Sequence, residues 1–347
     1  AESPPDAAEA EFHAGWYSLR FLNNSARAAK HFANVLEASS TPITQARGHY
    51  WLARAKSGPA AVQHYKAAAQ HAGTYYGQLA AQQLGVRKLN ISNPKPSAAD
   101  RTRFASRDLV RAIAALEEAG YQSRADMIYR HLAESLDSPG ELALLAARAE
   151  KRGNRPLALQ VGKTAHQRGL EVDSVSWPVG AIPNSAKIGD TGRALAYSIA
   201  RQESAFNVGA VSPADARGLL QLLPGTAKMM AKKTGQPYKP KALTTDAASN
   251  ATLGAAYLSE QLDNFDNSYI LTFAGYNAGP GRVREWIGQY GDPRGQKIDA
   301  VVDWVERIPF TETRNYVMRV MENYQIYKAR LSSSQLDIEN DLRFGRR

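Results

Sequence analysis

Residues 193–224 read RALAYSIARQESAFNVGAVSPADARGLLQLLP, and the start of this stretch has the periodicity of an amphipathic helix. Ala196, Ile199, Ala200 and Glu203 follow one another at i, i+3, i+4 and i+7, so they share one helix face. A carboxylate rarely lies on a buried face unless it is paired, caps a neighbouring helix or has a function. Glu203 is therefore the first candidate functional residue.

Three sequence blocks resemble the soluble lytic transglycosylases, a family in which an α-helical superhelix precedes a goose-type-lysozyme-like catalytic domain. The blocks are IARQESAF (199–206) with SPADARGLLQLLPGTA (212–227), AGYNAGPGRV (274–283) and ERIPFTETRNYV (306–317). They occur in the family's order, which a single chance match would not explain. The resemblance is strong from Pro178 onward and only loose, as superhelical architecture, before it.

The expected fold is all-α, because no stretch sustains the period-two alternation of a half-buried strand. The length of 347 residues favours two or three domains. From the resemblance we expect a helical-hairpin superhelix over 1–90 and further hairpins or a linker domain over 91–177. The goose-type-lysozyme-like catalytic domain is then expected over 178–347.

An internal repeat supports the superhelix. Gly15, Tyr17, Leu19, Ala28, His31 and Phe32 recur 33 positions later as Gly48, Tyr50, Leu52, Ala61, His64 and Tyr65. This is the period of a helix-turn-helix unit. Histidines at equivalent repeat positions beside aromatic residues are more often packing residues than metal ligands, so we assign no function to His31 and His64.

The remaining pattern predicts a series of helices. They are expected at 101–119, 123–135, 140–152 and 155–168, and then at 225–234, 246–265, 269–276, 297–306 and 313–330. Proline-containing segments at 91–100 and 176–192 read as joints. The polar tail, 332–347, is expected to fray or to dock.

Composition limits the class of function. The formal charge of +10 is spread as +6 over residues 1–180 and +4 over the rest, which suits attraction to an anionic polymer better than the concentrated stripe of a nucleic-acid binder. With no Cys, the chain has no disulfide or thiolate nucleophile. It lacks an apolar run long enough to span a membrane, and AESPPDAAEA at its start lacks the basic and apolar parts of a signal peptide, so we expect any export signal to have been removed or never cloned.

The chemistry suggested by Glu203 is general acid catalysis on a glycosidic oxygen. An apolar setting raises the pKa of a carboxyl group and keeps it protonated near neutral pH. Ordinary glycosidases use two carboxyl groups, but no second one has a matching context. The downstream candidates are Asp215, Asp246, Asp263 and Asp266.

The resemblance implies a reaction that needs only one carboxyl group. In the family, the acid protonates the β-1,4 bond between N-acetylmuramic acid and N-acetylglucosamine. It then acts as a base while the C6 hydroxyl of the muramic acid closes a 1,6-anhydro ring. By this resemblance Glu203 is the catalytic residue, and no metal, nucleotide or other cofactor is expected.

Further site residues carry over by their position in the blocks. Ser212 matches the serine that binds sugar at the cleavage site, although Ser-Pro also reads as a plain turn. Gln221 and Leu223 match residues that line the cleft. Tyr276 matches the tyrosine beside the acid, and Asn277, with Gly279, shapes the adjoining turn.

Three residues of the last block are expected to face the stem peptide or the cleft: Glu312, Arg314 and Tyr316. Glu312 has an alternative interpretation, because a Glu in the first turn of a helix is stabilising without any substrate. The sequence also departs from the family pattern. Asp215 stands where the family usually has Gly, Leu220 and Leu223 replace Met, and Gly275 replaces Ala.

Other functions stay open. Goose-type lysozymes share the fold and the Glu but act as muramidases that hydrolyse the same bond. A catalytically inert cell-wall-binding scaffold is a second alternative, against which the intact Glu203, Ser212, Gln221 and Tyr276 argue. The resemblance implies peptidoglycan glycan strands and stem peptides as partners in the periplasm, with room for other cell-wall or envelope-assembly proteins.

Overall fold

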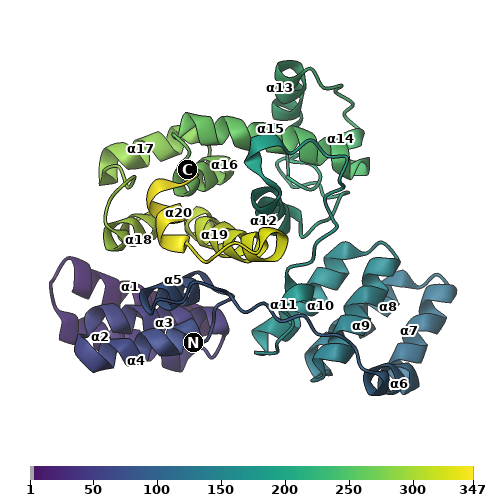
Figure 1. The fold of residues 1–347 in the computed structure, drawn as a ribbon, viewed down its shortest axis with the longest axis horizontal. Helices are drawn as coiled ribbons and strands as arrows, with labels where there is room; N and C mark the ends of the chain where they lie inside the picture. Colours follow the sequence, from purple (N-terminus) through teal and green to yellow (C-terminus); the bar gives the residue numbers. More distant parts are fainter. Residues whose placement is uncertain (1–3, 347) are drawn as a thin grey trace. The chain divides into compact units, whose positions relative to one another are not determined.

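The computed structural model describes residues 4–346, which form α-helices joined by loops (Figure 1). Within this range the β-type contacts are isolated bridges that join Arg217 to Val211 and to Leu222, so the all-α prediction is confirmed. No helix between residues 4 and 346 has both the length and the apolarity needed to cross a membrane. The chain divides into two compact units, which are Ala1–Leu89 with Gln261–Arg347, and Asn90–Glu260.

The N-terminal helices of the first unit form the predicted hairpins. They are α1 (Pro4–Arg20), α2 (Ser25–Ala38), α3 (Pro42–Ala55), α4 (Gly58–Ala69) and α5 (Tyr75–Gln83), and α1 packs on α2 as α3 packs on α4. The repeated glycines permit this close packing. A Cβ atom added at Gly15 would come within 2.6 Å of Phe32, and one at Gly48 within 2.5 Å of Leu36.

The first unit also contains the C-terminal helices, and α5 packs against two of them. These helices are α16 (Tyr269–Ala278), α17 (Pro280–Tyr290), α18 (Ile298–Glu306), α19 (Thr311–Ser332) and α20 (Ile338–Phe344), and α5 contacts α19 and α20. The sequence did not predict α17, because Gly279 and Pro280 read as a turn, whereas Pro in the first turn can begin a helix. It left the tail undecided between fraying and docking. The tail docks through buried Ile338 and Leu342.

The second unit begins with another set of helical hairpins. They are α6 (Ala98–Ser106), α7 (Asp108–Glu118), α8 (Gln122–Ser135), α9 (Pro139–Lys151), α10 (Arg155–Gln167) and the short α11 (Asp173–Ser176). The prediction of one helix over 101–119 was wrong, because Arg107 has extended backbone between α6 and α7 (ψ 130°). Its guanidinium binds the buried carboxylate of Glu141 at 2.8 and 3.0 Å, a contact between distant residues that local propensity does not reveal.

The rest of the second unit carries residues 193–224. A 3₁₀ turn (Gly189–Thr191) leads into α12 (Arg193–Ser204), and α13 (Pro224–Thr234), α14 (Ala242–Thr245) and α15 (Ala247–Asn264) follow. The division between the two units falls inside α15, at Glu260, whereas the sequence suggested boundaries at 90 and 177. The boundaries at 90 and 177 separate segments that we expect to fold independently, and they stay predictions.

Candidate active site

Helix α12 holds Glu203 in its last turn. The predicted face is buried at Ala196, Ile199 and Ala200, each 0% exposed, while Glu203 itself is partly exposed. The helix is held firmly to the segment before it. Arg201 donates from Nε to the carbonyl oxygen of Ser176 at 2.9 Å. A largely buried helix therefore presents the Glu203 carboxyl group at its accessible end.

The backbone turns sharply directly after Glu203. Ala205 and Phe206 both have positive φ angles, 51° and 64°, which are uncommon for residues other than glycine. Phe206 is 1% exposed and makes an edge contact with Tyr197, at 5.9 Å between ring centroids. Buried packing of Phe206 thus holds a strained turn beside the candidate acid, and such strain is often found at functional sites.

The loop that follows fixes Ser212 by three hydrogen bonds. Its backbone N–H donates to the carbonyl oxygen of Ala216 at 2.9 Å, and its carbonyl oxygen accepts from the N–H of Asp215 at 2.9 Å. Its hydroxyl oxygen accepts from the N–H of Ala216 at 3.0 Å. A hydroxyl that accepts here still has a proton to donate to a ligand.

Asp215, which departs from the family pattern, has a left-handed backbone with φ of 64°. This explains why glycine is usual at the position, because glycine adopts positive φ without steric cost. The Asp215 side chain is exposed, and the guanidinium of Arg217 binds both of its oxygens, at 2.8 and 3.1 Å. The hydrogen bond to Asp215 raises the pKa of Arg217. The extra carboxylate is thus neutralised within its own loop.

The side chain of Gln221 completes the loop. Its amide nitrogen donates to the carbonyl oxygens of Gly218 and Ala210, at 2.8 and 3.3 Å, which leaves the amide oxygen as an acceptor. Leu223 is 48% exposed at the start of α13. Its exposure is compatible with a residue that lines a substrate cleft.

Asn250 on α15, which the sequence analysis did not single out, binds the same loop through its side chain. Its side chain is 0% exposed. It accepts from the N–H of Leu220 at 2.9 Å and donates to the carbonyl oxygens of Arg217 and Leu243, at 2.8 and 3.0 Å. Gly218 allows this approach, since a Cβ atom there would lie 2.2 Å from the amide nitrogen. The only sequence signal was a polar residue within an otherwise apolar helix face.

The other predicted site residues belong to the first unit. Tyr276 and Asn277 lie partly buried in the last turn of α16, which ends at Gly279 with φ of 88°. The hydroxyl of Thr313 donates to the side-chain oxygen of Asn277 at 2.6 Å. This bond joins the end of α16 to the start of α19, so the structure brings Asn277 close to the last of the three sequence blocks.

Two of the three residues in that last block are buried. Glu312 is exposed in the first turn of α19, whereas Arg314 and Tyr316 are each 5% exposed. Arg314 binds the carboxylate of Glu9 at 2.6 Å and lies 3.7 Å from that of Glu306. The expected roles of these three residues toward substrate stay predictions. The structure adds that the Arg314 guanidinium takes part in a buried ion-pair cluster.

That cluster joins α1, α3 and α5 to α18 and α19. Arg47 binds Glu9 at 2.6 Å and Glu306 at 2.9 Å, and the hydroxyl of Tyr76 donates to Glu306. Burial alone would raise the pKa of Glu9, but the hydrogen bond with His13 and the guanidinium groups of Arg47 and Arg314 hold that pKa well below its usual range. Glu9 is therefore ionised across the neutral range.

Comparison with known proteins finds family matches for the two stretches that carry Glu203 and the other predicted site residues. Residues 184–298 match the family model for the transglycosylase SLT domain, and residues 307–336 match that for the soluble lytic transglycosylase helical domain. The soluble lytic murein transglycosylase of Escherichia coli is 40% identical over 156 residues, which are 45% of this chain and 23% of that protein. Its Salmonella typhimurium counterpart is 39% identical over 159 residues, which are 46% of this chain and 24% of that protein.

Solved structures extend the similarity to most of the fold. A Pseudomonas aeruginosa lytic transglycosylase, solved as an inactive mutant with glutamine in place of a glutamate, has a TM-score of 0.68 and 29% identity over 90% of this chain and 50% of its own. The 70 kDa soluble lytic transglycosylase of E. coli has a TM-score of 0.68 and 26% identity over 93% of this chain and 52% of its own. This chain thus spans about half the length of those proteins.

Proposed function

Because the resemblance to the soluble lytic transglycosylases is confirmed over residues 184–298 and 307–336, we propose that this chain is a peptidoglycan lytic transglycosylase. The proposal rests on Glu203 at the accessible end of α12 and on the loop beside it. The glutamate-to-glutamine mutant of the P. aeruginosa protein is named as inactive, which agrees with a single essential carboxyl group. Product analysis, described below, tests the proposal.

Glu203 acts first as an acid and then as a base. Its carboxyl proton passes to the oxygen of the β-1,4 bond between N-acetylmuramic acid and N-acetylglucosamine, and the bond from that oxygen to C1 of the muramic acid breaks. The N-acetyl group of the same sugar captures C1. The Glu203 carboxylate then removes the C6 hydroxyl proton while O6 bonds to C1, so that the N-acetyl group is released. No water is consumed, and the carboxyl group regains its proton.

The neighbouring residues position the sugar during these steps. The Ser212 hydroxyl proton and the Gln221 amide oxygen provide a donor and an acceptor for the muramic acid and its acetamido group. Leu223 supplies apolar contact. From their match to the family's sequence block, Tyr276 and Asn277 are also proposed to bind the substrate. Glu312, Arg314 and Tyr316 are assigned to the stem peptide and the cleft wall.

The observation that favours ring closure over hydrolysis is the ion pair between Asp215 and Arg217. A muramidase of the alternative type needs a second carboxylate, either to activate water or to attack the sugar. Asp215 is the only acidic residue between Glu203 and α13, and Arg217 binds both of its oxygens. Both oxygens of Asp215 are thus occupied by a partner within the loop, which disfavours either role. Capture by the C6 hydroxyl is intramolecular and so is favoured by proximity.

Mass spectrometry of purified sacculi digested by the enzyme distinguishes the two reactions. We expect products that end in 1,6-anhydromuramic acid, lighter by one water than hydrolysis products and without a reducing end. Asp215→Gly should give the same products, because glycine suits the positive φ of this position. Predominantly reducing ends that disappear in Asp215→Gly would establish the muramidase alternative. Intact sacculi would indicate an inert cell-wall-binding scaffold.

Localisation and partners follow from the proposed substrate. Peptidoglycan strands and their stem peptides lie in the periplasm, so we place the enzyme there. The net charge of +10 supports association with a wall polymer that carries acidic stem peptides. Other cell-wall or envelope-assembly proteins are proposed as further partners.

A further inference from the structure

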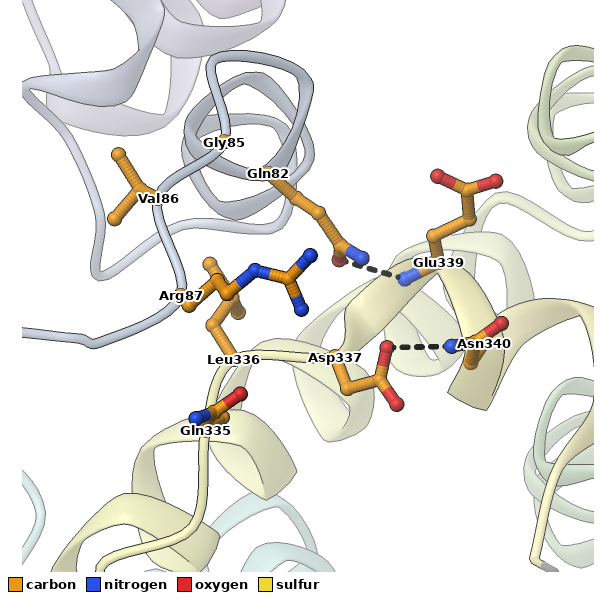
Figure 2. Close-up of a pocket in the computed structure, with 9 residues that line it drawn as sticks. All are labelled: Gln82, Gly85, Val86, Arg87, Gln335, Leu336, Asp337, Glu339 and Asn340. Atoms are coloured by element: carbon orange, nitrogen blue, oxygen red, sulfur yellow. Dashed lines mark hydrogen bonds between the residues drawn. The ribbon is translucent and has the colours of Figure 1, made fainter.

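A cavity of about 320 Å³ lies within the first unit, between the segment that follows α5 and the segment that precedes α20 (Figure 2). Its volume is at the lower end of the range for small-molecule sites, roughly 300–1,000 Å³. It is lined by Gln82, Gly85, Val86 and Arg87 and, from the C-terminal segment, by Gln335, Leu336, Asp337, Glu339 and Asn340. None of these residues belongs to the candidate active site.

The walls of this cavity are tied to each other. The N–H of Leu336 donates to the carbonyl oxygen of Arg87 at 2.9 Å, and the N–H of Glu339 donates to the side-chain oxygen of Gln82 at 3.0 Å. Leu336 is 4% exposed and anchors its segment. The cavity is therefore preformed by contacts between residues far apart in the chain.

Opposite charges in the cavity do not pair with each other. Figure 2 shows the Arg87 guanidinium extending from one wall into the space and the Asp337 carboxylate on the other wall. Asp337 accepts from the side-chain amide of Asn340 at 2.8 Å. Glu339 is turned away from Arg87 in Figure 2 and pairs with Arg343 at 3.2 Å. Among residues 4–346, none forms an ion pair with Arg87 or with Asp337.

We propose that this cavity binds a zwitterion, the charged end groups of an amino acid or short peptide. The ligand carboxylate binds the Arg87 guanidinium, whose planar fork of donors matches a carboxylate. The ligand ammonium binds the Asp337 carboxylate. A zwitterion gives each of these two groups the oppositely charged partner that residues 4–346 do not supply. The proposal does not depend on the catalytic activity.

A second cavity also contains charged residues, but there the charges pair with one another. In the second unit, Glu117, Asp126 and Arg152 line a space of about 730 Å³. There Arg152 binds both carboxylates, so the charges neutralise each other and offer no pair of sites to a charged ligand.

The test is an NMR titration of the full chain with glycine and, separately, triglycine. Glycine should saturate with a dissociation constant of about millimolar order, because so few ligand atoms make contact. Acetate and methylammonium, which each carry one of the two charges, should bind at least tenfold more weakly. Tighter binding of glycine than of triglycine would identify a free amino acid as the ligand, and the reverse order would identify a peptide with both ends charged.

Variants assign the binding to this cavity. Arg87→Gln and Asp337→Asn should each weaken binding of the better probe at least tenfold, and neither should alter cleavage of sacculi. Lys88→Gln removes a neighbouring exposed charge that does not line the cavity, and it should bind like the unaltered chain. Absence of saturable binding by both probes, or equal loss in Lys88→Gln, would overturn the proposal.

Discussion

Glu203 and Asp215 are twelve positions apart in one stretch, yet their surroundings give them different chemistry. Glu203 ends a buried helix and is followed by a strained turn whose Phe206 is 1% exposed. Asp215 is exposed on a loop and bound by Arg217. At the scale of single residues, Glu203 thus lies at the accessible end of a helix, as the proposed acid requires, whereas Asp215 is paired within its own loop.

Replacing Glu203 with glutamine should reduce cleavage of sacculi at least about 100-fold, because an amide fills the same space but cannot donate a proton at neutral pH. The melting temperature should stay near that of the unaltered chain, since a protonated acid and an amide have similar hydrogen-bonding needs. Turbidity loss of sacculi and circular dichroism measure the two effects. Glu285→Gln, at an exposed glutamate paired with Arg282, is the control. Residual activity above a few per cent would contradict the assignment.

At the scale of structural elements, the loop between α12 and α13 depends on α15 for its shape. Ser204 donates from its hydroxyl to the carbonyl oxygen of Leu219 at 2.9 Å, and Asn250 binds three further backbone groups. The loop has no regular secondary structure to satisfy these groups internally. Buried side chains therefore supply the hydrogen bonds that keep Ser212 and Gln221 in place.

Asn250→Ala should lower the free energy of unfolding by about 2–4 kcal/mol, because it leaves buried backbone groups without partners. It should also lower kcat several-fold while Glu203 stays intact, since the loop loses its anchor. Denaturant unfolding and steady-state kinetics on soluble glycan oligomers measure these effects. Ser249→Ala, one residue earlier, should change neither. A stability loss well below 1 kcal/mol in Asn250→Ala would show that the loop holds its shape without α15.

The first hairpins contain a group of histidines that makes stability depend on pH. Burial lowers the pKa of His49, and the charges of His64 and His71 lower it further. Burial lowers the pKa of His64 and of His71 as well. The unfolded chain therefore binds more protons than the folded chain below the ordinary histidine pKa of 6.5, so stability falls as the pH drops through that value.

His49→Gln should reduce this acid sensitivity, because one of the three groups no longer titrates. We expect the drop in melting temperature between about pH 7 and about pH 5 to be smaller in His49→Gln than in the unaltered chain. His131→Gln removes an exposed histidine on α8 and should leave the drop unchanged. Equal drops in all three proteins would show that other groups govern the acid response.

At the scale of the whole molecule, charged residues on α18 face the N-terminal hairpins. Asp303 is bound by Arg20 at 2.7 Å and accepts from the indole N–H of Trp16 at 3.2 Å. Glu306, with its side chain 0% exposed, is bound by Arg47. The first unit thus combines residues from both ends of the chain through ion pairs as well as apolar contacts.

We expect the fragment 178–347 to fold and to cleave soluble glycan oligomers, but with a lower melting temperature than the full chain. Removing the hairpins exposes Glu306 and Asp303 to water, so these carboxylates are solvated and do not prevent folding. The removal also exposes apolar surface to water, and this lowers the stability of the fragment. In the full chain, Arg47→Ala should lower the free energy of unfolding by about 3 kcal/mol, because Glu306, with its side chain 0% exposed, loses the nearer of its two guanidinium partners. A fragment without a cooperative thermal transition would mean that the hairpins form part of the catalytic core.

The sequence by itself determined the all-α class, most helix positions and the candidate acid. Helical periodicity and hairpin repeats arise from neighbours a few residues apart, so they are visible in the residue order. Glu203 was singled out because it interrupts such a pattern within a recognisable block, and its catalytic role stays a prediction. The blocks likewise carried Ser212, Gln221 and Tyr276 as candidates.

Only the tertiary structure decided how those residues are supported. The contacts of Asn250 with Leu220, of Arg107 with Glu141 and of Arg314 with Glu9 join residues 30, 34 and 305 positions apart. Such contacts form where separate helices meet, and no local spacing marks the partners. These contacts give buried polar groups their hydrogen-bond partners, and they thereby fix the shape of the loop between α12 and α13 and the break between α6 and α7. Leaving the groups without partners would cost more free energy than local helix propensities can supply.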